Sequence, residues 1–156
     1  MAAKPAPLEA GTAAPDFSGE THDGQTVVLK DYAGQMLALY FYPKDSTPGC
    51  TAQACNLRDN IDGLTDAGIA VVGVSPDSLE SHEKFSGKHE LNFPLIADPD
   101  REIIDAFGVW GEKQNYGKTY MGLQRTTFLI DADGVIVHVF KRPKTKAHAE
   151  EILSKI

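Results

Sequence analysis

Two kinds of hydrophobic pattern alternate along the chain, and together they predict its secondary structure. Short apolar runs predict β-strands at residues 26–29, 35–42, 69–75, 94–97, 126–130 and 135–140. Apolar residues spaced three or four apart predict helices at residues 50–65, from a cap at Asp77 or Ser78 to about residue 88, at residues 100–107 and at residues 146–156. Strands and helices that alternate in this way are typical of an α/β sheet.

Two of the predicted strands, residues 35–42 and 69–75, are apolar without alternation. Such runs are typical of central strands that are buried on both faces. Pro43 ends the first of them, and residues 44–49 have the composition of a turn before the next helix. The centre of the chain therefore predicts a strand–loop–helix unit.

The order of elements predicts an α/β, thioredoxin-like fold, with a central mixed β-sheet flanked by helices and one insertion. The last two strands are separated by residues 131–134, Asp-Ala-Asp-Gly, which predict a hairpin turn. Residues 108–124 are predicted to form a long connection, of a kind that compact domains usually keep for function. Its aromatic residues, Trp110, Tyr116 and Tyr120, are expected to pack against the protein.

Length, composition and charge narrow the class of protein. A chain of 156 residues, 42% hydrophobic and 24% charged, is expected to fold as one globular domain over residues 1–156. Fifteen basic and 22 acidic residues give a net charge of −7, which repels nucleic acid and anionic lipid surfaces. Neither nucleic acid nor a membrane is therefore expected as a partner.

The sequence also predicts a cytoplasmic location. The longest apolar run, residues 36–42, is much shorter than the roughly 20 residues of a membrane helix. The first eleven residues contain no apolar stretch like that of a signal peptide. Two cysteines are too few for a secreted disulfide framework and suit a reducing compartment.

One of these cysteines stands where the chain passes from a buried strand into a helix. Residues 41–50 read FYPKDSTPGC, so Cys50 is expected at the helix start. The free N–H groups and the dipole of a helix N-terminus favour the thiolate, which is the nucleophilic form. Gly49 allows a small ligand to approach the backbone closely, and the Thr47 hydroxyl can donate to an oxygen near the sulfur. A cysteine that only packs into the helix start gives the same pattern, so the residues alone leave both interpretations open.

These residues match the pattern Pro-x-x-x-Thr-x-x-Cys, and the chain resembles the peroxiredoxins, specifically the bacterioferritin comigratory protein or peroxiredoxin Q group. The resemblance covers nearly the whole chain. It includes the segments APDF at residues 14–17, YFYPKDSTPGCT at 40–51, VVGVSPDS at 71–78, FPLIADPD at 93–100 and YGKTYMGLQRTTFLID at 116–131.

The resemblance implies roles for several residues. Cys50 is similar to the peroxidatic cysteine, Thr47 to its hydroxyl partner, Pro43 to the residue that shields the pocket, and Arg125 to the guanidinium beside the thiolate. Without the resemblance, Arg125 would be interpreted as a solvated surface residue. Cys55 is similar in position to the resolving cysteine of the subgroup that places it five residues after the first; the alternative is a small core residue.

Helix geometry bears on the second cysteine. Five residues along an α-helix correspond to a rotation of about 140° and a rise of about 7.5 Å, which puts the two Cα atoms about 8.6 Å apart. A disulfide spans at most about 7 Å between Cα atoms. A bond between Cys50 and Cys55 therefore requires the helix to unwind.

Two positions depart from the pattern that the family commonly shows. Gln53 stands where the family commonly has Glu, three residues after the peroxidatic cysteine. Glutamine can keep a hydrogen bond to the active-site arginine but cannot balance its charge. Leu57 stands where an aromatic residue is common, a change expected to affect packing under the helix.

The resemblance implies a thiol-dependent peroxidase that reduces hydrogen peroxide and alkyl hydroperoxides, with no metal or other cofactor. Cys50 would become a sulfenic acid, Cys55 would condense with it, and thioredoxin or a glutaredoxin-like donor would reduce the disulfide. A monomer is expected. Two alternatives remain: a thioredoxin-type disulfide oxidoreductase, whose CxxC motif is absent, and a binding or metallochaperone module that uses both cysteines as soft ligands.

The other polar side chains give weaker signals. Five histidines, His22, His82, His89, His138 and His148, are scattered without the spacing of a zinc site, and solvated histidines are expected. Four cations near the C-terminus, Lys141, Arg142, Lys144 and Lys146, are interrupted by Pro143 and are expected to form a solvated edge.

Overall fold

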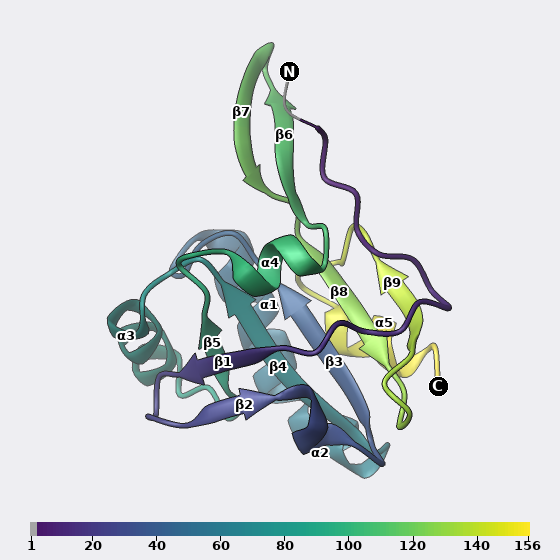
Figure 1. Ribbon diagram of the computed structural model, residues 1–156. Helices are drawn as coiled ribbons and strands as arrows, with labels where there is room; N and C mark the ends of the chain where they lie inside the picture. The colour runs from purple at the N-terminus through teal and green to yellow at the C-terminus, as the bar shows by residue number, and fades with distance from the viewer. Residues whose placement is uncertain (1–2) are drawn as a thin grey trace.

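The computed structural model describes residues 3–156. Seven of the strands in this part of the chain form one mixed sheet in the order β2-β1-β5-β4-β3-β8-β9, and two more form a separate hairpin (Figure 1). The sheet strands are β1 (Ser18–Thr21), β2 (Thr26–Val28), β3 (Met36–Phe41), β4 (Ile69–Ser75), β5 (Leu95–Ala97), β8 (Thr126–Ile130) and β9 (Ile136–Phe140). The helices are the 3-10 helix η1 (Leu29–Tyr32), α1 (Pro48–Asp59), α2 (Ile61–Asp66), α3 (Leu79–His89), α4 (Glu102–Ala106) and α5 (His148–Leu153).

The centre of the sheet is formed by β3, which pairs parallel with β4 and antiparallel with β8. The pairing Phe41↔Thr126 brings the carboxyl end of β3 beside the start of β8. Both neighbours were predicted from the hydrophobic pattern with the bounds observed here. Their apolar runs are continuous because both faces of the central sheet are covered.

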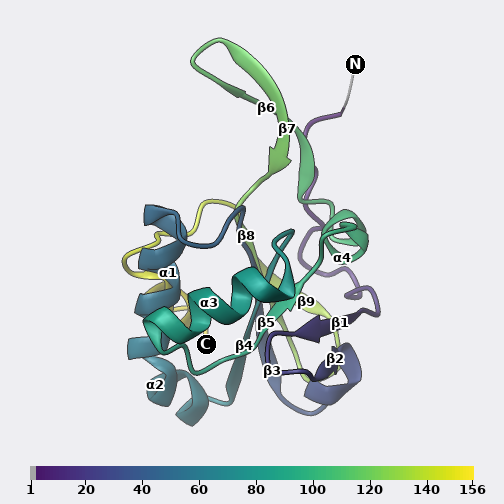
Figure 2. The same cartoon turned by 90° about the vertical axis from the view of Figure 1, so that its left-hand side faces the viewer.

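Side chains of β3 alternate between two hydrophobic layers. Leu37, Leu39 and Phe41 pack on the face that carries α4. Ala38 and Tyr40 face the layer of α1, α2, α3 and α5, which Figure 2 shows on the other side of the sheet. The helix α1 therefore lies against the sheet directly beyond the end of β3, as a strand–loop–helix unit requires.

The helix predicted at residues 50–65 is two helices, which meet at Asn60. The Asn60 side chain donates to the carbonyl oxygen of Asn56, four residues earlier, at 2.8 Å. Asparagine competes with the helix backbone through such local bonds, which explains the break. Between residues 3 and 156, no helix is both long enough and apolar enough to cross a membrane.

The strand β1 is absent from the prediction because its inward side carries no large apolar side chain. It pairs with β2 and with β5, and its inward positions are Gly19 and Thr21. A Cβ atom on Gly19 would lie 2.3 Å from the side chain of Ile96. Close packing against β5 thus removes the alternation that would mark this segment as a strand.

The long connection predicted at residues 108–124 is wrong, because these residues form a projecting hairpin of β6 (Trp110–Asn115) and β7 (Lys118–Leu123) (Figure 1). Tyr116 and Gly117 both have positive φ, 51° and 78°, as a two-residue hairpin turn requires. Trp110 packs under the Arg101 guanidinium, but Tyr116 and Tyr120 are exposed, contrary to expectation. With much of its surface in solvent, the hairpin lacks a regular apolar alternation.

Candidate active site

Cys50 is the third residue of α1, at the end of the loop that follows β3. Thr47 is the N-cap, and Pro48 occupies the first turn, where its missing N–H has no partner to lose. The Cys50 side chain is only 1% exposed. Cys50 therefore lies in the first turn of a twelve-residue helix, a position that favours an anion.

Arg125 reaches this sulfur from the start of β8. Its Nη2 donates to Cys50 Sγ at 3.2 Å, and its Nη1 donates to Gln53 Oε1 at 2.6 Å. Gln53 thus keeps a hydrogen bond to the arginine, as expected, and supplies no negative charge. One guanidinium is held in place by α1 while it contacts the thiol.

Gly49 lies close beside the Arg125 guanidinium. A Cβ atom built on Gly49 would lie 3.1 Å from Nη2 of Arg125. Such a contact is tight, so a larger residue requires the guanidinium to shift by a few tenths of an ångström.

Thr47 and Pro43 lie in the same loop, and both are half-buried. The Thr47 hydroxyl donates to the carbonyl oxygen of Lys44 at 2.9 Å. In this structure the Thr47 hydrogen therefore points to the loop backbone, and a bond to a substrate oxygen requires the hydroxyl to rotate. Ser46, with φ of 66°, provides the sharp bend before Thr47.

Cys55 lies on the same helix as Cys50 but on another side of it. Both cysteines are free thiols, and Cys55 is half-buried. Because α1 is continuous from Pro48 to Asp59, helix geometry puts their Cα atoms about 8.6 Å apart. The two sulfurs cannot bond while this helix is intact.

A buried polar network under the loop escaped the sequence analysis. His82 and His148 are fully buried, so the expectation of solvated histidines is wrong for both. Nδ1 of His82 lies 2.7 Å from Asp45 Oδ2, and its Nε2 lies 2.9 Å from the carbonyl oxygen of Ile96. A carbonyl oxygen only accepts, so Nε2 donates, and the carboxylate takes a second hydrogen bond from Nδ1. Both ring nitrogens of His82 are therefore engaged, one with Asp45 and one with the backbone.

Asp45 is held by further hydrogen bonds. Tyr42 Oη donates to its Oδ1 at 2.6 Å, and Ser81 Oγ donates to its Oδ2 at 2.8 Å. Burial would raise the pKa of Asp45, but the hydrogen bonds from His82 and Tyr42 outweigh it and hold this pKa below its usual value. The network fastens the loop before Cys50 to β3 and α3.

Asp45, Asp77 and His82 also place three potential metal-ligand atoms within 4.8 Å of one another. The atoms are already engaged. Asp77 Oδ2 accepts from the Asp45 backbone N–H and from Ser75 Oγ, both at 2.7 Å. The cluster is therefore satisfied by its own hydrogen bonds.

We expect Asp45→Ala to lower the free energy of unfolding by about 3 kcal/mol, because it leaves the side chains of Tyr42, Ser81 and His82 without their shared hydrogen-bond partner. Urea denaturation at neutral pH measures this loss. The pKa of Asp45 is lowered by folding, so its contribution is present above about pH 4 and is lost as the pH falls through the folded value. The difference between wild type and variant should therefore shrink in acid, and a constant difference would contradict the stabilising role of the ionised Asp45 carboxylate.

The opening near Arg125 is basic, although the chain as a whole is acidic. A cleft of about 430 Å³ is lined by Lys113, Gln124, Arg125, Lys141, Arg142 and Pro143. Lys141, Arg142, Lys144 and Lys146 are all exposed, as expected, but the first two also line this cleft. Arg125, which contacts Cys50 Sγ, thus also borders a basic cleft that faces solvent.

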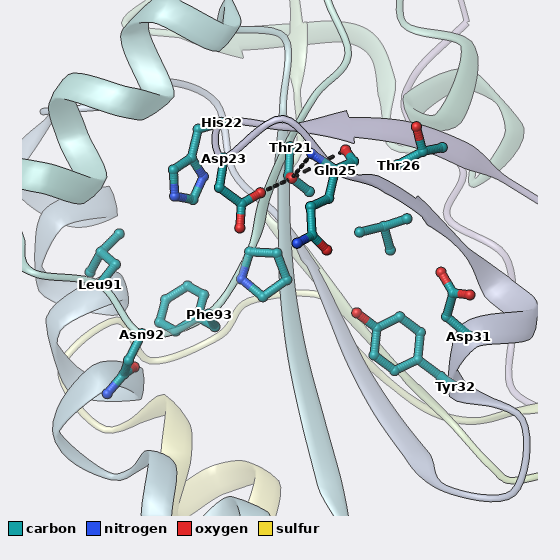
Figure 3. Close-up of a pocket in the computed structure, with 12 residues that line it drawn as sticks. Thr21, His22, Asp23, Gln25, Thr26, Asp31, Tyr32, Leu91, Asn92 and Phe93 are labelled. Atoms are coloured by element: carbon teal, nitrogen blue, oxygen red, sulfur yellow. Dashed lines mark hydrogen bonds between the residues drawn. The ribbon is translucent and has the colours of Figure 1, made fainter.

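A larger cavity, of about 670 Å³, lies elsewhere (Figure 3). His22 and Asp23, between β1 and β2, face the segment Leu91–Phe93 across it. That segment precedes β5, so the cavity lies toward the amino ends of the parallel strands, whereas Cys50 follows the carboxyl end of β3. It contains none of the residues predicted to form the site.

Replacing Arg125 by methionine should slow the peroxide reduction that the resemblance implies by roughly a hundredfold, the usual effect of removing one charge-stabilising donor. It removes the cation 3.2 Å from the sulfur. Stopped-flow mixing with hydrogen peroxide measures the rate, and alkylation of Cys50 by iodoacetamide should slow as well. Lys84→Met removes a cation whose side chain is 78% exposed and serves as the control. If Arg125→Met reacted with peroxide as fast as Lys84→Met, Arg125 would have no role in the reaction.

Comparison with known proteins identifies relatives along nearly the whole chain. The model of the AhpC/TSA family matches residues 10–139. The chain is 52% identical over 148 residues to peroxiredoxin Bcp of Escherichia coli, with 95% of each chain covered. It is 45% identical over 149 residues to peroxiredoxin Bcp of Bacillus subtilis, with 96% of this chain and 95% of the relative covered.

Solved structures of peroxiredoxins also superpose closely on this chain. A mutant of Xanthomonas campestris peroxiredoxin Q superposes with a TM-score of 0.87 at 37% identity, covering 95% of this chain and 97% of the other. The bacterioferritin comigratory protein of the same organism, described for its alkyl peroxide reduction activity, gives a TM-score of 0.86 at 38% identity, covering 95% and 94%. The predicted thioredoxin-like fold is thereby confirmed. The chain belongs to the AhpC/TSA family, in the bacterioferritin comigratory protein and peroxiredoxin Q group of peroxiredoxins, which are thiol-dependent peroxidases.

Proposed function

We propose that Cys50 is the peroxidatic cysteine of this peroxidase and that it reduces hydrogen peroxide and alkyl hydroperoxides. The Cys50 thiolate attacks the distal peroxide oxygen, and the O–O bond breaks. Cys50 becomes a sulfenic acid, and the leaving oxygen takes a proton and departs as water or an alcohol. The observation that carries the proposal is the contact of Arg125 with Cys50 Sγ at a helix N-terminus.

Arg125 and the loop residues have separate roles in this proposal. The Arg125 guanidinium and the N–H groups at the start of α1 stabilise negative charge on the sulfur and then on the leaving oxygen. Thr47 turns its hydroxyl toward the peroxide, Pro43 shields the thiol from water, and Gly49 leaves room for the substrate. The chemistry needs no metal, because the thiols supply the electrons.

We propose that Cys55 resolves the sulfenic acid. Its thiol loses a proton, the thiolate attacks Cys50 Sγ, and the S–O bond breaks to give the Cys50–Cys55 disulfide. The departing hydroxide takes up a proton and leaves as water. Thioredoxin, or a glutaredoxin-like donor, then reduces the disulfide. In this proposal the whole cycle is carried by one domain, acting as a monomer in the cytoplasm, where such reductants keep thiols reduced.

A coupled assay tests the proposal as a whole. Thioredoxin, thioredoxin reductase and NADPH are mixed with the protein and with hydrogen peroxide or an alkyl hydroperoxide. Catalytic NADPH oxidation that requires both the peroxide and the protein is the expected result. A disulfide oxidoreductase would oxidise or reduce protein thiols without consuming peroxide, and a binding module would do neither.

The contacts of α1 indicate which part of the helix unwinds when the disulfide forms. Beyond Cys55, Asn56 accepts from the Ala149 N–H at 2.7 Å, and Arg58 donates to the carbonyl oxygen of His89 at 2.7 Å. These bonds hold the second half of α1 to α5 and to α3. The first half is tied to β8 by Arg125, whose partner atom on Cys50 changes on oxidation.

We therefore expect oxidation to remove amide protection mainly in residues 51–54, whose N–H groups donate to the carbonyl oxygens of residues 47–50 in the intact helix, while β4 stays protected. Hydrogen exchange on reduced and disulfide-oxidised protein measures this difference. Peptide mapping must first show that the Cys50–Cys55 bond is present. Equal protection of residues 51–54 in both states would mean that the bond forms without unwinding, against the helix geometry.

A further inference from the structure

The side chain of His89, the last residue of α3, lies against Cys55. Cys55 Sγ and His89 Nδ1 are 3.9 Å apart, a distance at which sulfur takes part in a weak hydrogen bond. Both side chains are half-buried. Each is therefore partly accessible to a reactant and partly shielded from solvent. A thiol beside an imidazole nitrogen is the pairing by which proteins make a cysteine nucleophilic.

Two contacts support the position of His89, one through its ring and one through its backbone. Its ring makes a T-shaped contact with Phe85, one turn earlier in α3, with 5.1 Å between ring centroids. Its backbone carbonyl accepts the bond from Arg58, three residues after Cys55 and on the same face of α1. Asn92, just beyond α3, donates to the carbonyl oxygen of Arg58 at 3.3 Å.

We propose that His89 is the general base that deprotonates Cys55 for attack on the Cys50 sulfenic acid. This inference rests on the proposed role of Cys55 as the resolving cysteine. The nitrogen that faces the sulfur, Nδ1, takes the thiol proton. The Cys55 thiolate then attacks Cys50 Sγ, and the S–O bond breaks. The departing hydroxide takes the proton back from the imidazolium and leaves as water, so atoms and charges balance.

The contact between Cys55 and His89 is expected to persist while the first half of α1 unwinds. The bonds of Asn56 and Arg58 hold the second half of α1 in place, and Cys55 adjoins that half. Cys50 therefore moves toward Cys55 as the first half unwinds, while Cys55 keeps its imidazole neighbour. His89 would then act at the moment of disulfide formation and not only in the resting enzyme.

The test measures disulfide formation separately from peroxide consumption. Reduced protein is mixed with one equivalent of hydrogen peroxide, quenched with acid at successive times, and analysed by mass spectrometry. His89→Ala removes the base, and His89→Phe keeps a ring against Phe85 without a nitrogen. Both should form the disulfide roughly a hundredfold more slowly than wild type, and both should collect sulfenic acid on Cys50, which a second equivalent of peroxide should convert to sulfinic acid.

Added imidazole should restore disulfide formation in His89→Ala, where it can occupy the vacated space, and not in His89→Phe. His22→Ala, which alters the cavity of Figure 3, is the matched control and should behave as wild type. Wild-type rates in both His89 variants would overturn the proposal, as would a slow His89→Ala that His89→Phe fully repairs, because ring packing alone would then explain the effect. Absence of a Cys50–Cys55 disulfide in wild type would instead overturn the proposed function.

Discussion

Replacing Cys50 by serine is expected to abolish peroxidase activity, with a fall of at least about a thousandfold in the rate of peroxide consumption. A serine hydroxyl is almost wholly protonated at neutral pH, so the helix N-terminus and Arg125 have no anion to stabilise. The variant should keep its fold, because oxygen replaces sulfur in a site whose only described polar contact is the one from Arg125. The coupled assay measures the rate, and thermal unfolding checks the fold.

The outcome separates Cys50 from every other thiol of the chain. The chain contains two cysteines, so any thiol chemistry that survives Cys50→Ser must use Cys55. Sizeable turnover in the variant would move the reaction to Cys55 and would make the arginine contact a packing feature. Loss of activity together with loss of the fold would call for Cys50→Ala, which fits the same space.

The second large effect concerns turnover with thioredoxin. Cys55→Ser should consume one equivalent of peroxide at the wild-type rate and then stop, because the sulfenic acid on Cys50 has no internal thiol to condense with. Steady-state NADPH oxidation should fall to background. A burst experiment with limiting protein and mass spectrometry of Cys50 measures both phases.

Dithiothreitol supplies the matched control for this variant. A small dithiol can reduce the Cys50 sulfenic acid directly, so turnover with dithiothreitol should continue in Cys55→Ser. Undiminished turnover with thioredoxin as well would show that Cys55 is a packing residue. Failure with both reductants would point to a damaged Cys50 site and would leave the resolving role unsupported.

The reactive residues of the site could be predicted from the sequence better than the residues that hold them in place. Cys50, Thr47 and Gly49 lie within four residues on a strand–loop–helix unit, so local pattern alone brings them together. Arg125 is 75 residues away from Cys50, and only the resemblance to a family singled it out. The register of β3 against β8 is what brings it there, and no local pattern encodes that pairing.

The buried contact between Asp45 and His82 was missed for a related reason. Asp45 looks like an ordinary turn residue, and His82 falls on a helix among other polar side chains. Their partnership depends on α3 crossing over the loop, a contact between residues 37 apart. The Ser18–Thr21 strand and the hairpin of β6 and β7 escaped because close packing and exposure each erase hydrophobic alternation.

The Asp45–His82 pair also restricts how this loop can change over evolutionary time. Losing either partner alone leaves a buried polar group without its hydrogen-bond partner, which destabilises the fold. Exchanging both for apolar residues of similar volume often leaves the stability almost unchanged. Asp45 and His82 are therefore expected to be replaced together in evolution. Related proteins that keep only one of the two should be rare. The residues that fasten the reactive loop are thus expected to be inherited, or replaced, together.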